Sequence, residues 1–258
     1  MTTVAFIQAR MGSSRLPGKV LAPLAGEPSL ARIIHRVERA DGVDAVVVLT
    51  TESPLDEPLR RLAAEHGASC ISGSELDVLD RFQKGALETG ADRILRVTAD
   101  CPLVDPDVLG ELLRLQLHSE ADYAAVATGA LAATEGARRY PDGLDGEVFT
   151  AASLAAAWEE SRDPFEREHV TPFIWFRPDR FRLARLEAPY DLGAERWTVD
   201  YPEDLEFVQA VYENMPARPD FNWEDVIELL AREPELRNLN AAAREAASPV
   251  KHPSDLAN

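Results

Sequence analysis

The chain has 258 residues, 45% of them hydrophobic, which is enough to bury the core of one α/β domain with an elaboration. Its 27 basic side chains stand against 45 acidic ones, and the net charge of −18 argues against nucleic acid or an anionic membrane as the main partner. No charged-then-apolar leader is present, and no apolar run approaches the ~20 residues of a membrane helix. Cys70 and Cys101 lie in separate segments, which is typical of reduced thiols, so we expect a soluble protein of the cytoplasm.

Residues 4–9 form an apolar run without alternation, which predicts a strand buried on both faces of a parallel sheet. The following loop combines small residues with cations: Arg10, Gly12, Ser13, Ser14, Arg15, Pro17, Gly18 and Lys19. Small residues let backbone N–H groups approach an anion, and the three cations supply positive charge, so the loop is predicted to bind a polyphosphate. It matches neither the Walker A pattern nor Gly-x-Gly-x-x-Gly, and a solvated basic loop is the alternative.

Strand and helix patterns then alternate along the chain. Strands are predicted at 45–49, 69–71, 94–97, 122–127, 181–186 and 196–200. Helices are predicted at 28–40, 54–66, 77–88, 106–117, 151–161, 202–212 and 223–231. This succession implies right-handed crossovers and an α/β fold with a doubly wound, mostly parallel sheet, whose site lies at the carboxyl ends of the strands.

Carboxylates follow two of the predicted strands. Asp100 comes just past the fourth strand, where phosphates would arrive, and Mg²⁺ prefers one or two carboxylates together with phosphate oxygens and water. Asp200 ends the strand 196–200, and capping of the next helix is its alternative role. The two aspartates can converge only if their strands lie near each other. Asp105, in contrast, is expected to cap the helix that follows it, and Asp77 the helix that runs to about residue 88.

The loop from Ala9 to Lys19 resembles the signature loop of the sugar cytidylyltransferases, the group that holds the CMP-Kdo and CMP-sialic acid synthetases. The chain is most similar to the SpsF-type proteins of spore-coat polysaccharide synthesis. Further matching segments follow in the family's order at 77–82, 138–149, 165–172 and 196–204. The resemblance implies a Rossmann-like nucleotide-diphospho-sugar transferase fold, and Mg²⁺-dependent transfer of CMP from CTP to an acceptor with release of pyrophosphate. It also implies a homodimer with residues 130–175 at the interface.

The resemblance assigns roles to individual residues. For the nucleotide these are Ala9, Arg10, Gly12, Ser13, Arg15, Lys19, Arg81 and Asp100, with Arg10, Arg15 and Lys19 as the catalytic cations. For the metal they are Asp100 and Asp200, and for the acceptor Tyr140, Asp142, Glu147, Arg167 and His169. From the residues alone, Arg81 could lie on a solvated helix face, Pro-Asp-Gly at 141–143 could be only a turn, and His169 could be structural. Gly146 stands where most relatives would carry Val or a similar residue, which suggests a changed sugar pocket.

We therefore expect one nucleotidyltransferase domain over 1–240, with a substrate and dimer elaboration at about 128–175 and a flexible tail at 241–258. The acceptor could be an acidic sugar of the nonulosonic or Kdo type, a sugar phosphate or a phosphonate, and GTP or another nucleotide could replace CTP. A glycosyltransferase on the same fold is one alternative, although Asp142 and Asp145 lack the Asp-x-Asp spacing. A non-catalytic nucleotide-binding protein is the other.

Overall fold

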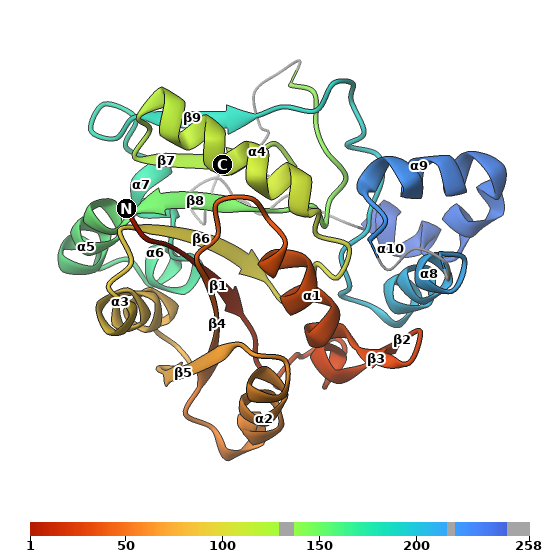
Figure 1. Ribbon diagram of the computed structural model, residues 1–258, viewed down its shortest axis with the longest axis horizontal. Helices are drawn as coiled ribbons and strands as arrows, with labels where there is room; N and C mark the ends of the chain where they lie inside the picture. Colours follow the sequence, from red (N-terminus) through yellow and green to blue (C-terminus); the bar gives the residue numbers. More distant parts are fainter. Residues whose placement is uncertain (129–136, 216–219, 247–258) are drawn as a thin grey trace.

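The computed structural model describes residues 1–128, 137–215 and 220–246. Its main sheet has seven strands: β1 (Thr3–Gln8), β4 (Ala45–Thr51), β5 (Ser69–Gly73), β6 (Arg93–Thr98), β7 (Tyr123–Val126), β8 (Glu147–Thr150) and β9 (Leu183–Leu186). They lie in the order β5-β4-β1-β6-β8-β7-β9 (Figure 1). A separate antiparallel pair is formed by β2 (Pro23–Leu24) and β3 (Glu27–Pro28).

Most of the strand pairs are parallel, as predicted. β1 pairs in parallel with β4 and β6, β4 with β5, and β7 with β9, whereas β8 is antiparallel to both of its neighbours. The α/β fold with a mostly parallel, doubly wound sheet is therefore confirmed. Sequence patterns did not predict β8, because its four residues follow a turn and pair with strands that lie far away in the chain.

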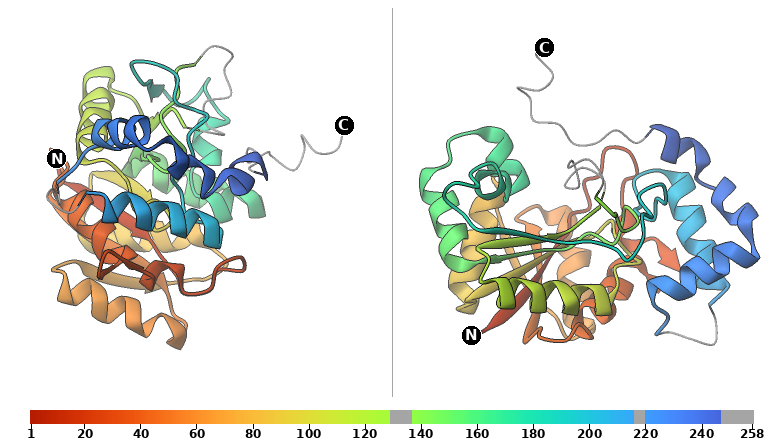
Figure 2. Two further views of the ribbon diagram at one scale, coloured as in Figure 1. Left: turned by 90° about the vertical axis from the view of Figure 1, so that its right-hand side faces the viewer. Right: turned by 90° about the horizontal axis from the view of Figure 1, so that it is seen from above.

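Helices cover both faces of this sheet, and the last three described helices lie together to one side of it (Figures 1 and 2). The helices are α1 (Ser29–Glu38), α2 (Glu57–Glu65), α3 (Val78–Thr89), α4 (Pro106–Ser119), α5 (Ala151–Glu160), α6 (Pro164–His169), α7 (Pro172–Trp175), α8 (Pro202–Glu213), α9 (Trp223–Arg232) and α10 (Ala241–Ala246). Alternation along β1 divides the core, since Ala5 and Ile7 join the cluster that contains α1 and α4, and Val4 and Phe6 join the cluster that contains α3 and α5.

Two helices that border the site begin at the predicted caps. The Asp105 carboxylate accepts hydrogen bonds from the N–H groups of Asp107 and Val108 at the start of α4. Asp77 accepts one from the N–H of Asp80 at the start of α3. Such caps stabilise a helix by about 1 kcal/mol each and fix where it starts.

The predicted strand at 196–200 is wrong. The segment is extended, but it makes only an isolated bridge between Arg196 and Asp142, because its N–H groups bond to loops and not to a strand of the sheet. The N–H of Val199 donates to the carbonyl of Asp100 at 2.7 Å, which brings the two aspartate loops together without a shared sheet.

The structure describes part of the predicted elaboration and part of the predicted tail. Residues 137–175 supply β8, α5, α6 and α7, while 129–136 of the predicted elaboration lie outside the described residues. The tail predicted from residue 241 begins as helix α10, and 247–258 lie outside the described residues. Among the described helices, none combines the length and apolar character needed to cross a bilayer.

Candidate active site

The basic loop leaves β1 at the carboxyl edge of the sheet and folds back on itself. The N–H of Ala9 donates to the carbonyl of Leu49 at 3.0 Å, and the N–H of Gly18 donates to the carbonyl of Met11 at 3.2 Å. Gly18 has a φ of 73°, a left-handed conformation that glycine adopts without steric cost. The loop is thus closed by its own backbone, which presents the residues between Met11 and Gly18 at the sheet edge.

Asp56 anchors this loop, and sequence reasoning missed it. Its carboxylate accepts a hydrogen bond from the N–H of Met11 at 2.8 Å and others from the N–H and hydroxyl of Thr51. Burial alone would raise the pKa of Asp56, but these hydrogen bonds hold it below its ordinary value, so the anchor is ionised. No local pattern marks Asp56, because its partners are forty-five and five residues away.

Two of the loop cations are half exposed and hold one acidic partner each. Arg10 Nη1 lies 3.5 Å from Glu75 Oε1, and the Arg10 side chain is 49% exposed. Arg15 Nη2 lies 2.8 Å from Asp200 Oδ1, with the Arg15 side chain 51% exposed. Such surface pairs contribute little to stability, so both guanidiniums can turn to an incoming anion at small cost.

Lys19 is more deeply placed, and it joins the two predicted metal ligands. Its Nζ donates to the carbonyl of Val199 at 2.6 Å, to Asp200 Oδ1 at 3.1 Å and to Asp100 Oδ2 at 3.4 Å. The structure therefore brings together Asp100 and Asp200, which are a hundred residues apart in the chain, around one ammonium group.

Each of these carboxylates is held by its other oxygen. Asp100 Oδ1 accepts from Thr98 Oγ1 at 2.5 Å, and Asp200 Oδ2 accepts from Arg196 Nη2 at 3.1 Å. Burial acts to raise the pKa of Asp100, but Lys19 and the Thr98 hydroxyl outweigh it and hold the pKa below its ordinary value. Both side chains are therefore oriented, and Asp100 is ionised.

Asp200 does not cap the helix after it. The N-cap is Tyr201, and Asp204, the third residue of α8, reaches back so that its Oδ2 accepts from the N–H groups of Asp200 and Tyr201 at 3.0 and 3.1 Å. Arg196 binds the Asp204 carboxylate through Nε and Nη2, at 3.1 and 3.0 Å. The capping role belongs to a neighbour, which leaves the Asp200 side chain for the cations.

The turn at 141–145 packs directly on the segment that carries Asp200. Gly143 has a φ of 112°, and a Cβ there would lie 2.5 Å from the Thr198 nitrogen, so no other residue fits without a shift. Asp142 Oδ2 accepts from Arg196 Nη1 at 2.8 Å. Burial and the nearby Asp145 raise the pKa of Asp142 to about 7, even though Arg196 opposes the shift.

Arg81 lies on α3 and is 1% exposed, so it is not on a solvated helix face. Its Nε and Nη1 have no hydrogen-bond partner among the described residues. Burial, followed by the charge of Arg10, lowers the pKa of Arg81 to about 10, which leaves the side chain charged at neutral pH. A buried cation with free donors is costly unless a ligand supplies acceptors.

Glu147 is buried in a network of its own. Its Oε1 accepts from the hydroxyls of Tyr123 and Thr171 at 2.6 Å each, and its Oε2 pairs with Arg96. His169 lies near the same charges, and burial lowers its pKa, so the ring is neutral at pH 7. Val170 follows with a φ of 72°, a strained conformation for a β-branched residue, and strain of this kind often marks functional sites.

The remaining predicted acceptor residues are engaged inside the protein. Arg167 binds Asp77 Oδ2 through Nε and Nη2 at 2.7 and 2.6 Å, and its Nη1 donates to two carbonyls. Tyr140 is buried, and its ring packs edge-on against Trp223. A Cβ on Gly146 would lie 2.6 Å from Leu109 Cδ2 of α4, so the missing side chain at Gly146 makes room for Leu109, and its effect on a sugar pocket stays a prediction.

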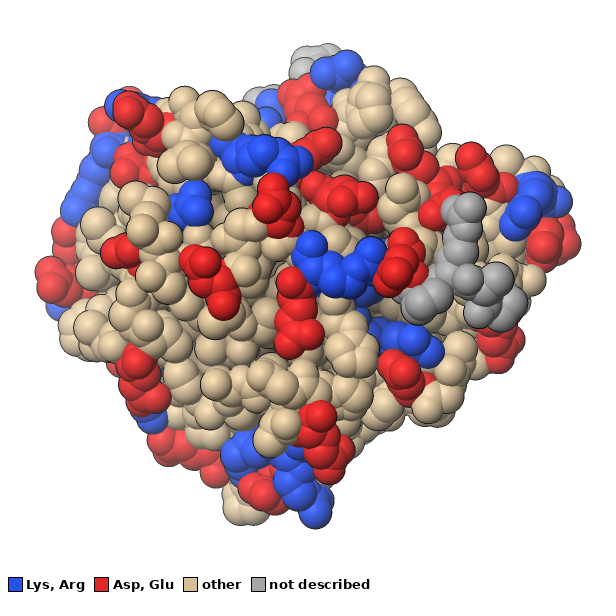
Figure 3. Space-filling model, viewed as in Figure 1, with Lys and Arg blue, Asp and Glu red and all other residues tan. Residues whose placement is uncertain are grey.

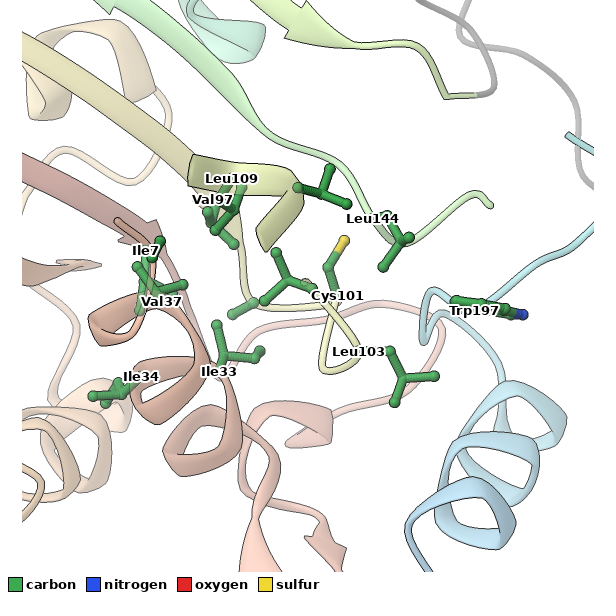
Figure 4. Close-up of a cluster of buried hydrophobic side chains, with 14 of the residues drawn as sticks. Ile7, Ile33, Ile34, Val37, Val97, Cys101, Leu103, Leu109, Leu144 and Trp197 are labelled. Carbon is green, nitrogen blue, oxygen red and sulfur yellow. The ribbon is translucent and has the colours of Figure 1, made fainter. Parts of the chain in front are cut away.

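Cys101, next to Asp100, is a packing residue. It is buried in the cluster that includes Leu103 and Leu144 (Figure 4). Burial and the neighbouring Asp100 raise the pKa of its thiol well above the ordinary value, so it is not an activated nucleophile.

Acidic residues outnumber basic ones by 45 to 27 in the sequence. On the face shown in Figure 3, acidic side chains lie beside the basic ones.

Within the described residues, no group of three or more His, Cys, Asp or Glu side chains is arranged to hold a metal ion. Asp100 and Asp200 are a pair of carboxylates. Mg²⁺ often takes one or two carboxylate ligands and completes its coordination shell with phosphate oxygens and water.

Comparisons with known proteins agree with this geometry. Residues 4–224 match the cytidylyltransferase family. The spore coat polysaccharide biosynthesis protein SpsF of Bacillus subtilis is 34% identical over 93% of this chain and 97% of its own length. A 3-deoxy-manno-octulosonate cytidylyltransferase of Anaeromyxobacter dehalogenans is 28% identical over 80% of this chain and 95% of its own.

A solved structure extends the likeness to the fold. A cytidylyltransferase from Leptospira borgpetersenii superposes with a TM-score of 0.84 at 28% identity, over 98% of this chain and all of that one. Sequence profile, relatives and fold agree over most of the chain. The chain belongs to the cytidylyltransferase family and is a nucleotidyltransferase of the sugar cytidylyltransferase type.

Proposed function

We propose that this enzyme transfers CMP from CTP to an acidic sugar in the presence of Mg²⁺, with release of pyrophosphate. The observation that carries the proposal is the position of the Lys19 ammonium. This group, at the end of the basic loop, donates hydrogen bonds to the carboxylates of both Asp100 and Asp200. Two carboxylates that already hold one cation are suited to hold the metal ion of a metal–triphosphate complex.

The basic loop would bind the triphosphate. Arg10 and Arg15 are half exposed and can swing from their single acidic partners to phosphate oxygens. A Cβ on Gly12 would meet nothing within 4 Å, so the backbone there is open to a ligand. The two guanidiniums would stabilise the charge that develops on the leaving pyrophosphate.

The two aspartates fit a magnesium ion. Each has one oxygen anchored by the protein and the other directed at Lys19, so the pair forms an oriented set of hard oxygen donors. Bound Mg²⁺ would neutralise the α-phosphate and lower the pKa of the attacking acceptor oxygen. Arg196 would keep Asp200 in place, because it also holds Asp142 and Asp204.

Arg81 would bind the nucleotide base or ribose. Its unpartnered Nε and Nη1 are buried donors that need acceptors, and a pyrimidine carbonyl supplies them. Gly73 makes room for this arrangement, since a Cβ there would lie 3.1 Å from Arg81 Cγ. These donors would favour a base with an exposed carbonyl, in agreement with CTP.

The acceptor would lie on the side of His169. Its neutral ring can donate to a hydroxyl or accept from one, and it packs against the ring of Phe165 with a centroid separation of 4.5 Å. Arg167 and Glu147 are bound to other parts of the protein, so we assign them positioning roles for α6 and β8. Asp142 lies beside the metal-site aspartates, where its raised pKa suits it to hold a proton near the acceptor.

The test is pyrophosphate release from the purified protein with Mg²⁺. CTP, UTP, GTP and ATP are each offered with nonulosonic and Kdo-type acids, sugar phosphates and phosphonates. We expect release with CTP and one class of acidic sugar. Release with another nucleotide would contradict the assignment of CTP, and release with sugar phosphates or phosphonates alone would contradict the assignment of the acceptor.

We also propose a homodimer that uses the described residues 137–175 and their neighbours. Trp158 on α5 is 37% exposed, and Phe176 just after α7 is 40% exposed. Large apolar side chains are favoured at such contacts. Sedimentation equilibrium should give a dimer that Trp158→Glu weakens, and a wild-type monomer at micromolar concentration would contradict the proposal.

A further inference from the structure

We propose that Lys19 is an internal counter-ion for the metal-binding oxygens of Asp100 and Asp200, which a divalent cation alone must displace and which a triphosphate draws away. Divalent cation and nucleotide then bind cooperatively, and the cation alone binds weakly. This inference rests on the proposed function, because it takes Asp100 and Asp200 as metal ligands.

The hydrogen-bond capacity of Lys19 supports this reading. An ammonium group has three N–H donors, and here three acceptors lie around it: the Val199 carbonyl, Asp200 Oδ1 and Asp100 Oδ2. The side chain is only 12% exposed, so water does not compete freely for these donors. Lys19 therefore cannot bind a phosphate oxygen without giving up at least one of the three acceptors.

The same contacts occupy the oxygens that a metal needs. Thr98 holds Asp100 Oδ1 and Arg196 holds Asp200 Oδ2, so the exchangeable oxygens are the two that face Lys19. Lys19 Nζ lies 3.4 and 3.1 Å from them, whereas Mg²⁺ draws its oxygen ligands to about 2.0–2.1 Å. A dication and an ammonium cannot share this space, since they would repel each other at short range.

The two binding events are therefore coupled. A triphosphate that attracts Lys19 frees both oxygens and raises metal affinity, and by linkage the metal raises triphosphate affinity by the same factor. Arg15 binds the same Oδ1 of Asp200 at 2.8 Å, but it is half exposed and can exchange with water. The coupling thus depends on Lys19 more than on Arg15.

The test is Mn²⁺ binding without nucleotide, measured by the electron paramagnetic resonance signal of free Mn²⁺. We expect Lys19→Met to bind Mn²⁺ at least tenfold more tightly than wild type. Lys19→Arg, which keeps the charge, should bind as weakly as wild type, and Lys84→Met should not differ from wild type. Equal Mn²⁺ affinity in wild type and Lys19→Met would overturn the inference.

Further variants separate this inference from the function on which it rests. Adding Asp100→Asn to Lys19→Met should abolish the gain. If the double variant binds Mn²⁺ as tightly as Lys19→Met, the ion is not at the aspartates and the proposed metal site is wrong. If Asp100→Asn weakens Mn²⁺ binding while Lys19→Met leaves it at the wild-type level, the metal site stands and the counter-ion role fails.

The wild-type protein offers a test that needs no variant. The chain has three lysines, Lys19, Lys84 and Lys251, so acylation of each amine can be followed by mass spectrometry. Saturating Mn²⁺ without nucleotide should speed the labelling of Lys19 relative to the other two, because the cation displaces its ammonium. An unchanged ratio would contradict the proposal.

Discussion

The two sides of the candidate site hold their charges in different ways. On the side that we propose for the phosphates, Arg10 and Arg15 are half exposed and have one acidic partner each. On the side that we propose for the acceptor, both carboxylate oxygens of Glu147 and every guanidinium nitrogen of Arg167 have a partner. The two exposed arginines can therefore turn to a substrate at small cost, whereas Glu147 and Arg167 are held in the framework. Substitutions on the two sides should therefore affect turnover and stability separately.

The largest effect is expected for Asp100→Asn on the phosphate side. Losing a metal ligand should lower kcat by about 10³-fold or more, because metal charge stabilisation is worth several kcal/mol. Steady-state rates and circular dichroism should show an inactive but folded protein. Asp107→Asn, an exposed change at the start of α4, is the matched control, and wild-type turnover in Asp100→Asn would refute the assignment.

Gly143→Ala should mainly affect stability. The left-handed φ and the contact of a Cβ with the Thr198 nitrogen should together cost about 2–4 kcal/mol, since the segment that carries Asp200 must shift. Urea unfolding measures the loss, with Gly12→Ala as the control in open space. Equal unfolding midpoints for the two variants would argue against the packed turn.

Glu147→Gln tests the acceptor side with a smaller change. Gln removes the charge opposite Arg96 and weakens a buried network, which should cost about 2 kcal/mol of stability. Because we assign Glu147 a positioning role, the KM for the acceptor should stay within about threefold of wild type at temperatures where the variant is folded. A rise in KM of tenfold or more, without a change in kcat, would mean that Glu147 touches the acceptor.

The smallest effect concerns the pH dependence of stability. The pKa of Asp142 in the folded protein is about 7, above its ordinary value, so the folded state binds more protons than the unfolded state between the two. This group therefore destabilises the fold progressively as pH rises toward and through 7. Thermal melting from pH 5.5 to 8 should show a smaller fall in Tm for Asp142→Asn than for wild type, and parallel curves would contradict the shift.

Local patterns were sufficient for most of the framework. The apolar runs of β1, β4 and β6 and the caps Asp77 and Asp105 are short-range signals, and the structure contains each of them. The antiparallel β8 was missed because its pairing is non-local. The segment 196–200 was predicted as a strand because local sequence does not show whether the backbone N–H groups donate to a neighbouring strand or, as here, to loops.

The sequence indicated those candidate site residues whose chemical type and position in the chain were informative by themselves. Composition and position singled out the loop cations and Asp100, and the structure places Lys19 against both aspartates, while the catalytic roles of these residues stay predictions. Asp56 and Arg196 could not be found, because their partners are distributed over the chain and only folding brings them together. For Arg167, the family motif suggested substrate contact, but its partner Asp77 lies ninety residues away.

We propose that Asp200 belongs to the reacting centre, whereas its neighbour Asp204 belongs to the framework. Both bind Arg196, but only Asp200 faces Lys19, so Asp200→Asn and Asp204→Asn form a matched pair. The decisive measurement is the rate of pyrophosphate release per folded molecule in these two variants, with CTP, Mg²⁺ and the acceptor identified for wild type. We expect Asp200→Asn to lose about 10³-fold or more in rate with its fold intact, and Asp204→Asn to lose stability but keep its turnover. Near wild-type release from Asp200→Asn would show that Asp200 is not part of the reacting centre.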